Sequence, residues 1–104
     1  MQFSSNSYQS RTGESDVPLL VDVRSELEYA GGHIQGALSW PLHELRQYAV
    51  ASKIAKETKV LVYCLSGARS SAACRELASM GYLNVTNGGG ISQLALQCGL
   101  PIMK

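Results

Sequence analysis

Short runs of branched apolar residues alternate along this chain with segments of helical periodicity, and this alternation restricts the possible folds more than any other feature. The runs LLVDV at 19–23 and KVLVY at 59–63 have the composition of strands that are buried on both faces. Segments of helical character follow them, over 25–30 and over 70–80. Strands that alternate with helices form a parallel sheet through right-handed crossovers, which cover both faces of the sheet. We therefore expect an α/β fold.

Local signals place the remaining elements. Ser25 followed three residues later by Glu28 forms a capping-box pattern, and Gly31 and Gly32 are suited to end the short helix that begins there. Periodicity and turn residues predict a brief strand at 37–40, a helix through 43–55, a short strand at 84–86, a glycine triplet at 88–90 and a last helix over 91–98.

The chain has 104 residues, enough for one hydrophobic core but not for two. Residues 1–16 are mostly polar, with five Ser and few apolar residues, a composition that buries too little apolar surface to offset the entropy of ordering. We expect a flexible N-terminal arm at 1–16 and a single domain over 17–104.

Charge and hydropathy limit the partners and the location. The formal net charge is +1 and the charged residues are scattered, which argues against a nucleic-acid partner. No apolar run approaches the roughly 20 residues that cross a bilayer, and the first ten residues are too polar for a secretory signal. We expect a cytoplasmic, monomeric protein with no membrane partner.

The cysteines do not form a structural framework. Cys64, Cys74 and Cys98 are odd in number and unevenly spaced, with no C-x-x-C pair and no nearby Cys/His set of the kind that binds zinc. We expect no disulfide, metal or cofactor. Reduced thiols in a cytosol-like compartment are the simplest interpretation, although a processed chain from an oxidising compartment would have the same pattern.

Cys64 occupies a position suited to chemistry. The strand, tight loop and helix around it place the thiol at the carboxyl end of a strand, where open parallel sheets build their sites. Small side chains in the loop allow its backbone N–H groups to point inward as an anion-binding nest. This nest, the positive end of the next helix and the Arg69 guanidinium favour a thiolate without a Cys–His pair. The loop residues are Leu65, Ser66, Gly67, Ala68 and Arg69.

A free cysteine is more often a small buried apolar residue than a nucleophile. For Cys64 the loop context favours the nucleophile. Nothing comparable surrounds Cys74 or Cys98, which we interpret as core or surface residues.

Three stretches together resemble the rhodanese (sulfurtransferase) family. CLSGARS at 64–70 resembles its C-x-x-G-x-R-S active-site loop. DVR at 22–24, EY at 28–29, GHI at 32–34, GA at 36–37 and Pro41 resemble its D-V-R…E-[YF]…G-H-I-x-G-A…P signature, and GY at 81–82, Val85 and GGG at 88–90 resemble its closing pattern. The similarity covers about residues 18–97.

This resemblance implies a three-layer α/β/α rhodanese-like fold with a central parallel sheet of four to five strands. It implies that Cys64 takes a sulfane sulfur from a donor such as thiosulfate and passes it, as a persulfide, to cyanide or a thiol. The backbone N–H groups that would hold the anionic persulfide as substrate-binding groups belong to Leu65, Ser66, Gly67, Ala68 and Arg69.

Loop length separates two activities on this scaffold. Six positions run from Cys64 to Arg69, whereas the related phosphatases and arsenate reductases have a loop one residue longer that encloses a tetrahedral oxyanion. The shorter loop favours a single sulfur atom. Leu65 and Ser66 stand where thiosulfate-using relatives often carry cationic residues, so a larger donor or a protein persulfide is a further hypothesis. A non-catalytic binding module is the alternative function, but such domains typically replace the cysteine.

Arg69 has two possible roles. It either stabilises the bound anion or ties the loop to an acidic side chain such as Asp22 or Glu28. We interpret Asp22 and Arg24 as a structural pair at the strand end, and His33 as a hydrogen-bonding turn residue.

Overall fold

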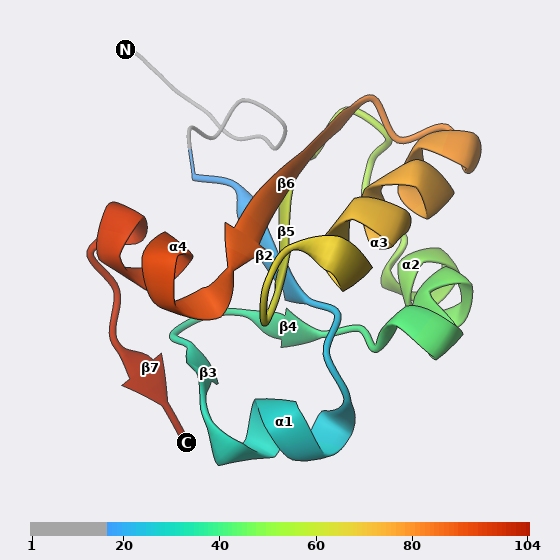
Figure 1. Ribbon diagram of the computed structural model, residues 1–104. Coiled ribbons are helices and arrows are strands. Elements are labelled where there is room, and N and C mark those ends of the chain that lie inside the picture. The colour runs from blue at the N-terminus through green and yellow to red at the C-terminus, as the bar shows by residue number, and fades with distance from the viewer. Residues whose placement is uncertain (1–16) are drawn as a thin grey trace, which may run out of the picture.

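A parallel sheet forms the centre of the computed structural model, which describes residues 17–104 (Figure 1). The sheet has four strands in the order β4-β2-β5-β6, and every neighbouring pair is parallel. These strands are β2 (Leu19–Asp22), β4 (Leu38–Ser39), β5 (Lys59–Cys64) and β6 (Asn84–Gly90). The carboxyl ends of the strands therefore meet at one edge of the sheet.

Helices cover both faces of the sheet. The 3-10 turn η2 (Leu42–Glu44), α2 (Leu45–Ser52) and α3 (Ala68–Ser79) lie on one side, and α4 (Ile91–Cys98) lies on the other (Figure 1). The short helix α1 (Glu26–Gly31) sits beyond the carboxyl ends of the strands, beside the loop that joins β5 to α3. The three-layer α/β/α arrangement is confirmed.

Alternation along β5 explains how the sheet divides the core. Val60, Val62 and Cys64 point into the cluster formed with α2 and α3, whereas Leu61 and Tyr63 point into the cluster formed with α4. Cys64 is thus the last residue of β5 that faces α2 and α3, and it lies at the border between that core cluster and the loop.

The capping box at α1 is confirmed. The Ser25 hydroxyl accepts a hydrogen bond from the Glu28 amide at 3.2 Å, and a Glu28 carboxylate oxygen accepts one from the Ser25 amide at 3.0 Å. This six-residue helix buries none of its own side chains, so these contacts and not a core determine where it begins.

Three elements differ from expectation. The helix expected over 43–55 ends at Ser52, because Lys53 adopts a left-handed conformation with a φ of 57°. The glycine triplet belongs to β6, which bulges at Gly88 where its register with β5 shifts. An unexpected strand, β7 (Ile102–Met103), pairs antiparallel with β3 (His33–Ile34).

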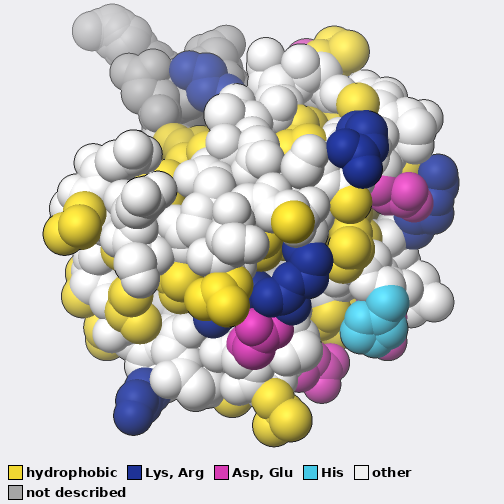
Figure 2. All heavy atoms as spheres, in the orientation of Figure 1, with side chains coloured by type: hydrophobic (Ala, Val, Ile, Leu, Met, Phe, Trp, Pro, Cys, Tyr) yellow, Lys and Arg dark blue, Asp and Glu magenta, His cyan; other side chains and the backbone are white. Residues whose placement is uncertain are grey.

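The arm expected at 1–16 lies outside the described residues and is drawn in grey in Figure 1 and Figure 2. None of the helices within 17–104 is long and apolar enough to cross a membrane.

Candidate active site

Cys64 ends β5 and lies at the base of the loop that leads into α3. Its residue is only 1% exposed, so the thiol is covered on the side of the core. The chain reverses at Gly67, whose φ of 101° suits glycine, and α3 begins at the next residue. This turn brings the Gly67 N–H to 2.9 Å from the Cys64 sulfur, to which it donates a hydrogen bond.

Ser70, in the first turn of α3, supplies a second polar contact. It is fully buried, and its hydroxyl oxygen accepts a hydrogen bond from the Cys64 thiol at 3.5 Å. Burial by itself raises the pKa of Cys64, but its hydrogen bond with the Ser70 hydroxyl and those from the amides of Ser70, Gly67 and Ser66 outweigh it. The pKa of Cys64 is lowered from 9.0 to about 7, so much of the sulfur is a thiolate at neutral pH.

The other predicted loop residues surround this sulfur in different ways. The Leu65 and Ser66 side chains are exposed at the rim of the loop, with Leu65 61% exposed. Gly67 forms the turn and Ala68 is the exposed first residue of α3. Of the predicted loop residues, Gly67 and Ser66 hydrogen-bond the buried sulfur through their backbone amides.

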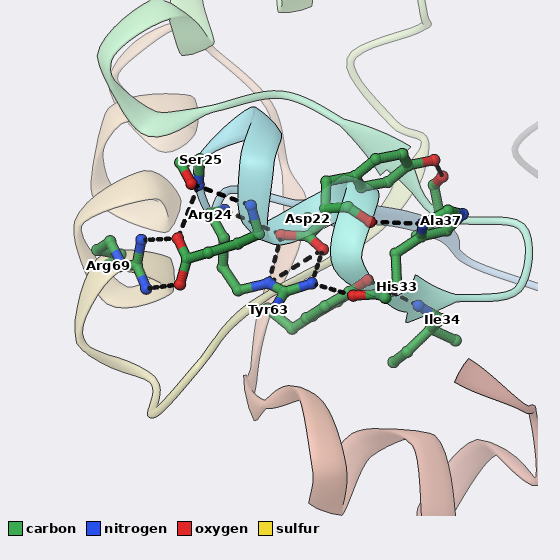
Figure 3. Close-up of polar contacts among 11 residues, drawn as sticks. Asp22, Arg24, Ser25, His33, Ile34, Ala37, Tyr63 and Arg69 are labelled. Carbon is green, nitrogen blue, oxygen red and sulfur yellow. Dashed lines mark hydrogen bonds and ion pairs between the residues drawn. The ribbon is translucent and has the colours of Figure 1, made fainter. Parts of the chain in front are cut away.

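Arg69 binds Glu28 of α1 through two parallel contacts. Its Nη1 donates to Oε1 of Glu28 at 2.7 Å and its Nη2 to Oε2 at 3.0 Å (Figure 3). The Arg69 guanidinium, together with the Ser25 amide, lowers the pKa of Glu28 to about 2. Of the two roles left open for Arg69, the tie to an acidic side chain is the one observed.

Asp22 and Arg24 form a second ion pair at the end of β2. The Asp22 side chain is fully buried, Arg24 Nη2 donates to its Oδ2 at 2.8 Å, and the same nitrogen donates to the Gly32 carbonyl at 2.6 Å (Figure 3). The hydrogen bond to Asp22 is the main cause that raises the pKa of Arg24. His33 bonds the Tyr29 carbonyl through Nδ1 at 2.9 Å, as expected of a turn residue.

A close approach between the loop and β6 explains one glycine of the triplet. A Cβ atom at Gly90 would lie 2.6 Å from the Leu65 carbonyl oxygen, closer than real side chains approach backbone. The residue after β5 can therefore pack against the end of β6 only because position 90 has no side chain.

Two polar residues of the site were not identified from the sequence. Ser70 stands in the C-x-x-G-x-R-S motif, but its contact with the sulfur was not predicted. Asn87, on β6, accepts a hydrogen bond from the Ser70 hydroxyl at 2.6 Å. An asparagine before three glycines is typical of a loop, so only the strand and its register could have revealed Asn87.

Cys74 and Cys98 lie apart from this arrangement. Cys74 is half-buried on α3 and burial raises the pKa of its thiol, while Cys98 is exposed at the end of α4. Within residues 17–104, no group of three or more His, Cys, Asp and Glu side chains is placed to hold a metal ion.

Comparison with known proteins places these residues in a family. A rhodanese-like domain model matches residues 4–95. A protein named sulfurtransferase from Allochromatium vinosum is 41% identical over 98% of this chain and 94% of its own. The thiosulfate sulfurtransferase PspE of Escherichia coli is 37% identical over 73% of each chain.

Solved structures agree with the sequence comparison. A rhodanese with anions from E. coli superposes with a TM-score of 0.76 at 34% identity, covering 85% of this chain and 99% of that one. The human single-domain sulfurtransferase TSTD1 superposes with a TM-score of 0.67 at 32% identity, covering 77% and 81%. With the fold, the loop and these relatives in agreement, the chain belongs to the rhodanese-like domain family.

Proposed function

We propose that this protein is a sulfurtransferase in which Cys64 carries sulfane sulfur as a persulfide. One observation carries the proposal: a buried thiol receives the Gly67 N–H at 2.9 Å and has a pKa of about 7, although burial alone would keep it protonated. The names of the relatives from A. vinosum and E. coli support the same activity.

The reaction needs no acid or base during sulfur transfer. The Cys64 thiolate attacks the outer sulfur of thiosulfate, the S–S bond of the donor breaks, and sulfite leaves with the bonding electron pair. The negative charge of the thiolate is then carried by the outer sulfur of the Cys64 persulfide. A thiolate or cyanide attacks that outer sulfur and leaves with it as a persulfide or thiocyanate, which regenerates the Cys64 thiolate.

The loop favours the persulfide through its backbone. In the persulfide the charge lies one atom further from Cys64, toward the mouth of the loop. The N–H groups of Leu65, Ser66, Gly67, Ala68 and Arg69, together with the positive end of the twelve-residue helix α3, would stabilise that charge.

We also propose that thiol-based persulfides are better donors than thiosulfate. The guanidinium groups of Arg69 in the loop and of Arg24 at the end of β2 are each bound by a carboxylate, so they offer little free charge to a dianion. The exposed Leu65 side chain at the rim favours an organic group on the donor. Kinetics with thiosulfate and with glutathione persulfide compare the two, and equal kcat/KM values would contradict this preference.

Mass spectrometry of the peptide that contains Cys64 is the decisive test. After incubation with thiosulfate or glutathione persulfide and removal of the donor, the peptide that contains Cys64 is expected to gain the mass of one sulfur atom. The gain should disappear on addition of cyanide, with release of thiocyanate. If no sulfane donor adds sulfur to Cys64, the chain is a binding module and the proposal is wrong.

A further inference from the structure

Asn87, a residue of β6, reaches the Cys64 sulfur only indirectly, through the Ser70 hydroxyl. The hydroxyl carries a single proton, but three acceptors surround it. Its oxygen lies 2.6 Å from Oδ1 of Asn87, 3.1 Å from the Gly67 carbonyl oxygen and 3.5 Å from the Cys64 sulfur. The short distance to Asn87 shows which acceptor receives the proton.

The orientation of the Asn87 amide is fixed by its other neighbours. The backbone N–H of Gly89 can only donate, and it lies 2.9 Å from the same Asn87 atom that faces Ser70. That atom must therefore be the carbonyl oxygen, and the amide nitrogen at the other end donates to the Gly67 carbonyl at 3.3 Å. Ser70 must donate to Asn87, and its lone pairs are left to face the sulfur.

The sheet explains why Asn87 reaches α3. Val85, two residues earlier on β6, packs into the core cluster on the α3 side, and side chains two apart on a strand share a face. The bulge at Gly88 follows directly and turns the chain toward the loop. Asn87 thereby contacts both Ser70 and Gly67, two of the residues that hydrogen-bond the Cys64 sulfur.

We propose that Asn87 is a positioning residue that holds the Ser70 hydroxyl proton away from Cys64 while the sulfur is uncharged, and competes with the sulfur for that proton when a thiolate forms. A thiol S–H can donate to the Ser70 lone pairs, but a thiolate needs the proton turned toward it. The hydroxyl must therefore rotate from Asn87 to the sulfur on ionisation. Asn87 is exposed, so water can replace the hydroxyl at its oxygen.

The proposal rests on the proposed function only for its part in turnover. When sulfur is taken up, the charge moves to the outer atom of the persulfide and the Cys64 sulfur becomes neutral, so the hydroxyl returns to Asn87. Each half-reaction is then accompanied by one rotation of the Ser70 hydroxyl, with no proton transferred.

The other titratable groups around the thiol are paired or neutral. They are Arg69 of α3 with Glu28 of α1, Asp22 with Arg24 at the end of β2, and the Cys74 and Tyr63 groups, whose pKa values burial raises. None of the residues of β6 or α4 is charged. A shift caused by Asn87 can thus be separated from these groups by changing Ser70.

The test measures the pH midpoint of Cys64 alkylation by iodoacetamide, without sulfur donor, in a chain that carries Cys74→Ser and Cys98→Ser. Asn87→Ala removes the competing acceptor, so the midpoint is expected to fall by about half a pH unit. This shift corresponds to about threefold more thiolate at a pH well below the midpoint. Combined with Ser70→Ala, the same substitution is expected to have no effect, because the hydroxyl that relays it is gone.

Controls separate this role from a structural one. Asn84→Ala, on the same strand, removes a side chain that bonds the Glu57 carbonyl instead, and is expected to leave the midpoint unchanged. Asn87→Asp keeps the acceptor oxygen and adds charge, so it is expected to raise the midpoint, and to raise it more when Ser70 is present. It remains informative if Asn87→Ala does not fold.

The proposal is overturned if Asn87→Ala leaves the midpoint unchanged or raises it, or if either Asn87 variant has the same effect without the Ser70 hydroxyl. Sulfur uptake is measured separately on the same variants. Persulfide formation without an Asn87-dependent shift refutes only the positioning role, and the shift without any sulfur uptake refutes only the proposed function.

Discussion

Cys64, at the end of β5, and Cys74, on α3, carry the same side chain, but their pKa values are shifted in opposite directions. Burial disfavours both thiolates, and Cys64 is almost inaccessible to solvent whereas Cys74 is half-buried. Of the two, only Cys64 has backbone N–H donors and a hydroxyl group at its sulfur, at the start of α3. The difference teaches that hydrogen-bond donors at a strand end, and not exposure, lower the pKa of one of these thiols.

The largest expected effect is on sulfur transfer, and it distinguishes the replacement of Cys64 from the replacement of Cys74. Cys64→Ser is expected to abolish sulfur transfer while the chain stays folded, because a serine hydroxyl is not ionised at neutral pH and cannot form a persulfide. Cys74→Ser is expected to retain activity close to that of the unmodified chain. Thiocyanate formation and circular dichroism measure the two effects, and loss of activity in Cys74→Ser alone would reverse the comparison.

The second expectation concerns pH. Because the pKa of Cys64 is lowered to about 7, its thiolate is present above that pH and is lost as the pH falls through it. At pH 7 we expect Cys64 to react with iodoacetamide roughly tenfold faster than Cys74, whose pKa lies above 9.0. Peptide mapping after timed alkylation measures both rates in a Cys98→Ser chain. Equal rates at pH 7 would show that the loop donors do not distinguish the two thiols.

A third expectation concerns the packing that aims the donors. Gly90→Ala places a Cβ against the Leu65 carbonyl, so the loop must move and its N–H groups leave the sulfur. We expect the alkylation midpoint to rise and unfolding to become easier by roughly 1–3 kcal/mol. Gly31→Ala is the matched control, since nothing lies within 4 Å of its added Cβ. An unchanged midpoint in Gly90→Ala would mean that the loop does not need this approach.

The smallest expected effect concerns the Arg69 charge. Because Glu28 neutralises the guanidinium, Arg69→Ala is expected to raise the Cys64 midpoint by less than about half a unit. Arg69→Ala and Glu28→Gln are both expected to lower the free energy of unfolding by up to about 1 kcal/mol, the range of partly exposed ion pairs. Alkylation profiles and urea unfolding test this. A rise of more than one unit in Arg69→Ala would assign the low pKa of Cys64 to charge and not to N–H donors.

Much of the fold was predictable because local signals agreed with the tertiary structure. The capping box set the start of α1, and the apolar run at 59–63 predicted the strand β5, which ends at Cys64. The helix through 43–55 was predicted too long because its apolar spacing continues past Lys53, where the backbone turns left-handed. The brief strand β7 forms only by pairing with β3, a contact that no local pattern indicates.

The site was predictable where the chain is continuous and not where it is joined through space. Residues 64–69 follow one another, so their turn could be inferred from small side chains and a glycine. The partner of Arg69 lies 41 residues away, and the sequence named Asp22 and Glu28 as possible partners without choosing between them. Asn87 reaches Ser70 through the register and bulge of β6, which depend on pairing with β5.

The Glu28 carboxylate belongs both to the cap of α1 and to the ion pair with Arg69, so substitutions at Ser25, Glu28 and Arg69 affect one another. One of its oxygens accepts from the Ser25 amide and from Arg69, so the cap of α1 and the clamp on the loop use the same atom. A substitution at Ser25 that unwinds this first turn also releases a guanidinium far along the chain. Designers who alter the α1 region to change donor preference therefore need to vary Ser25, Glu28 and Arg69 as one unit.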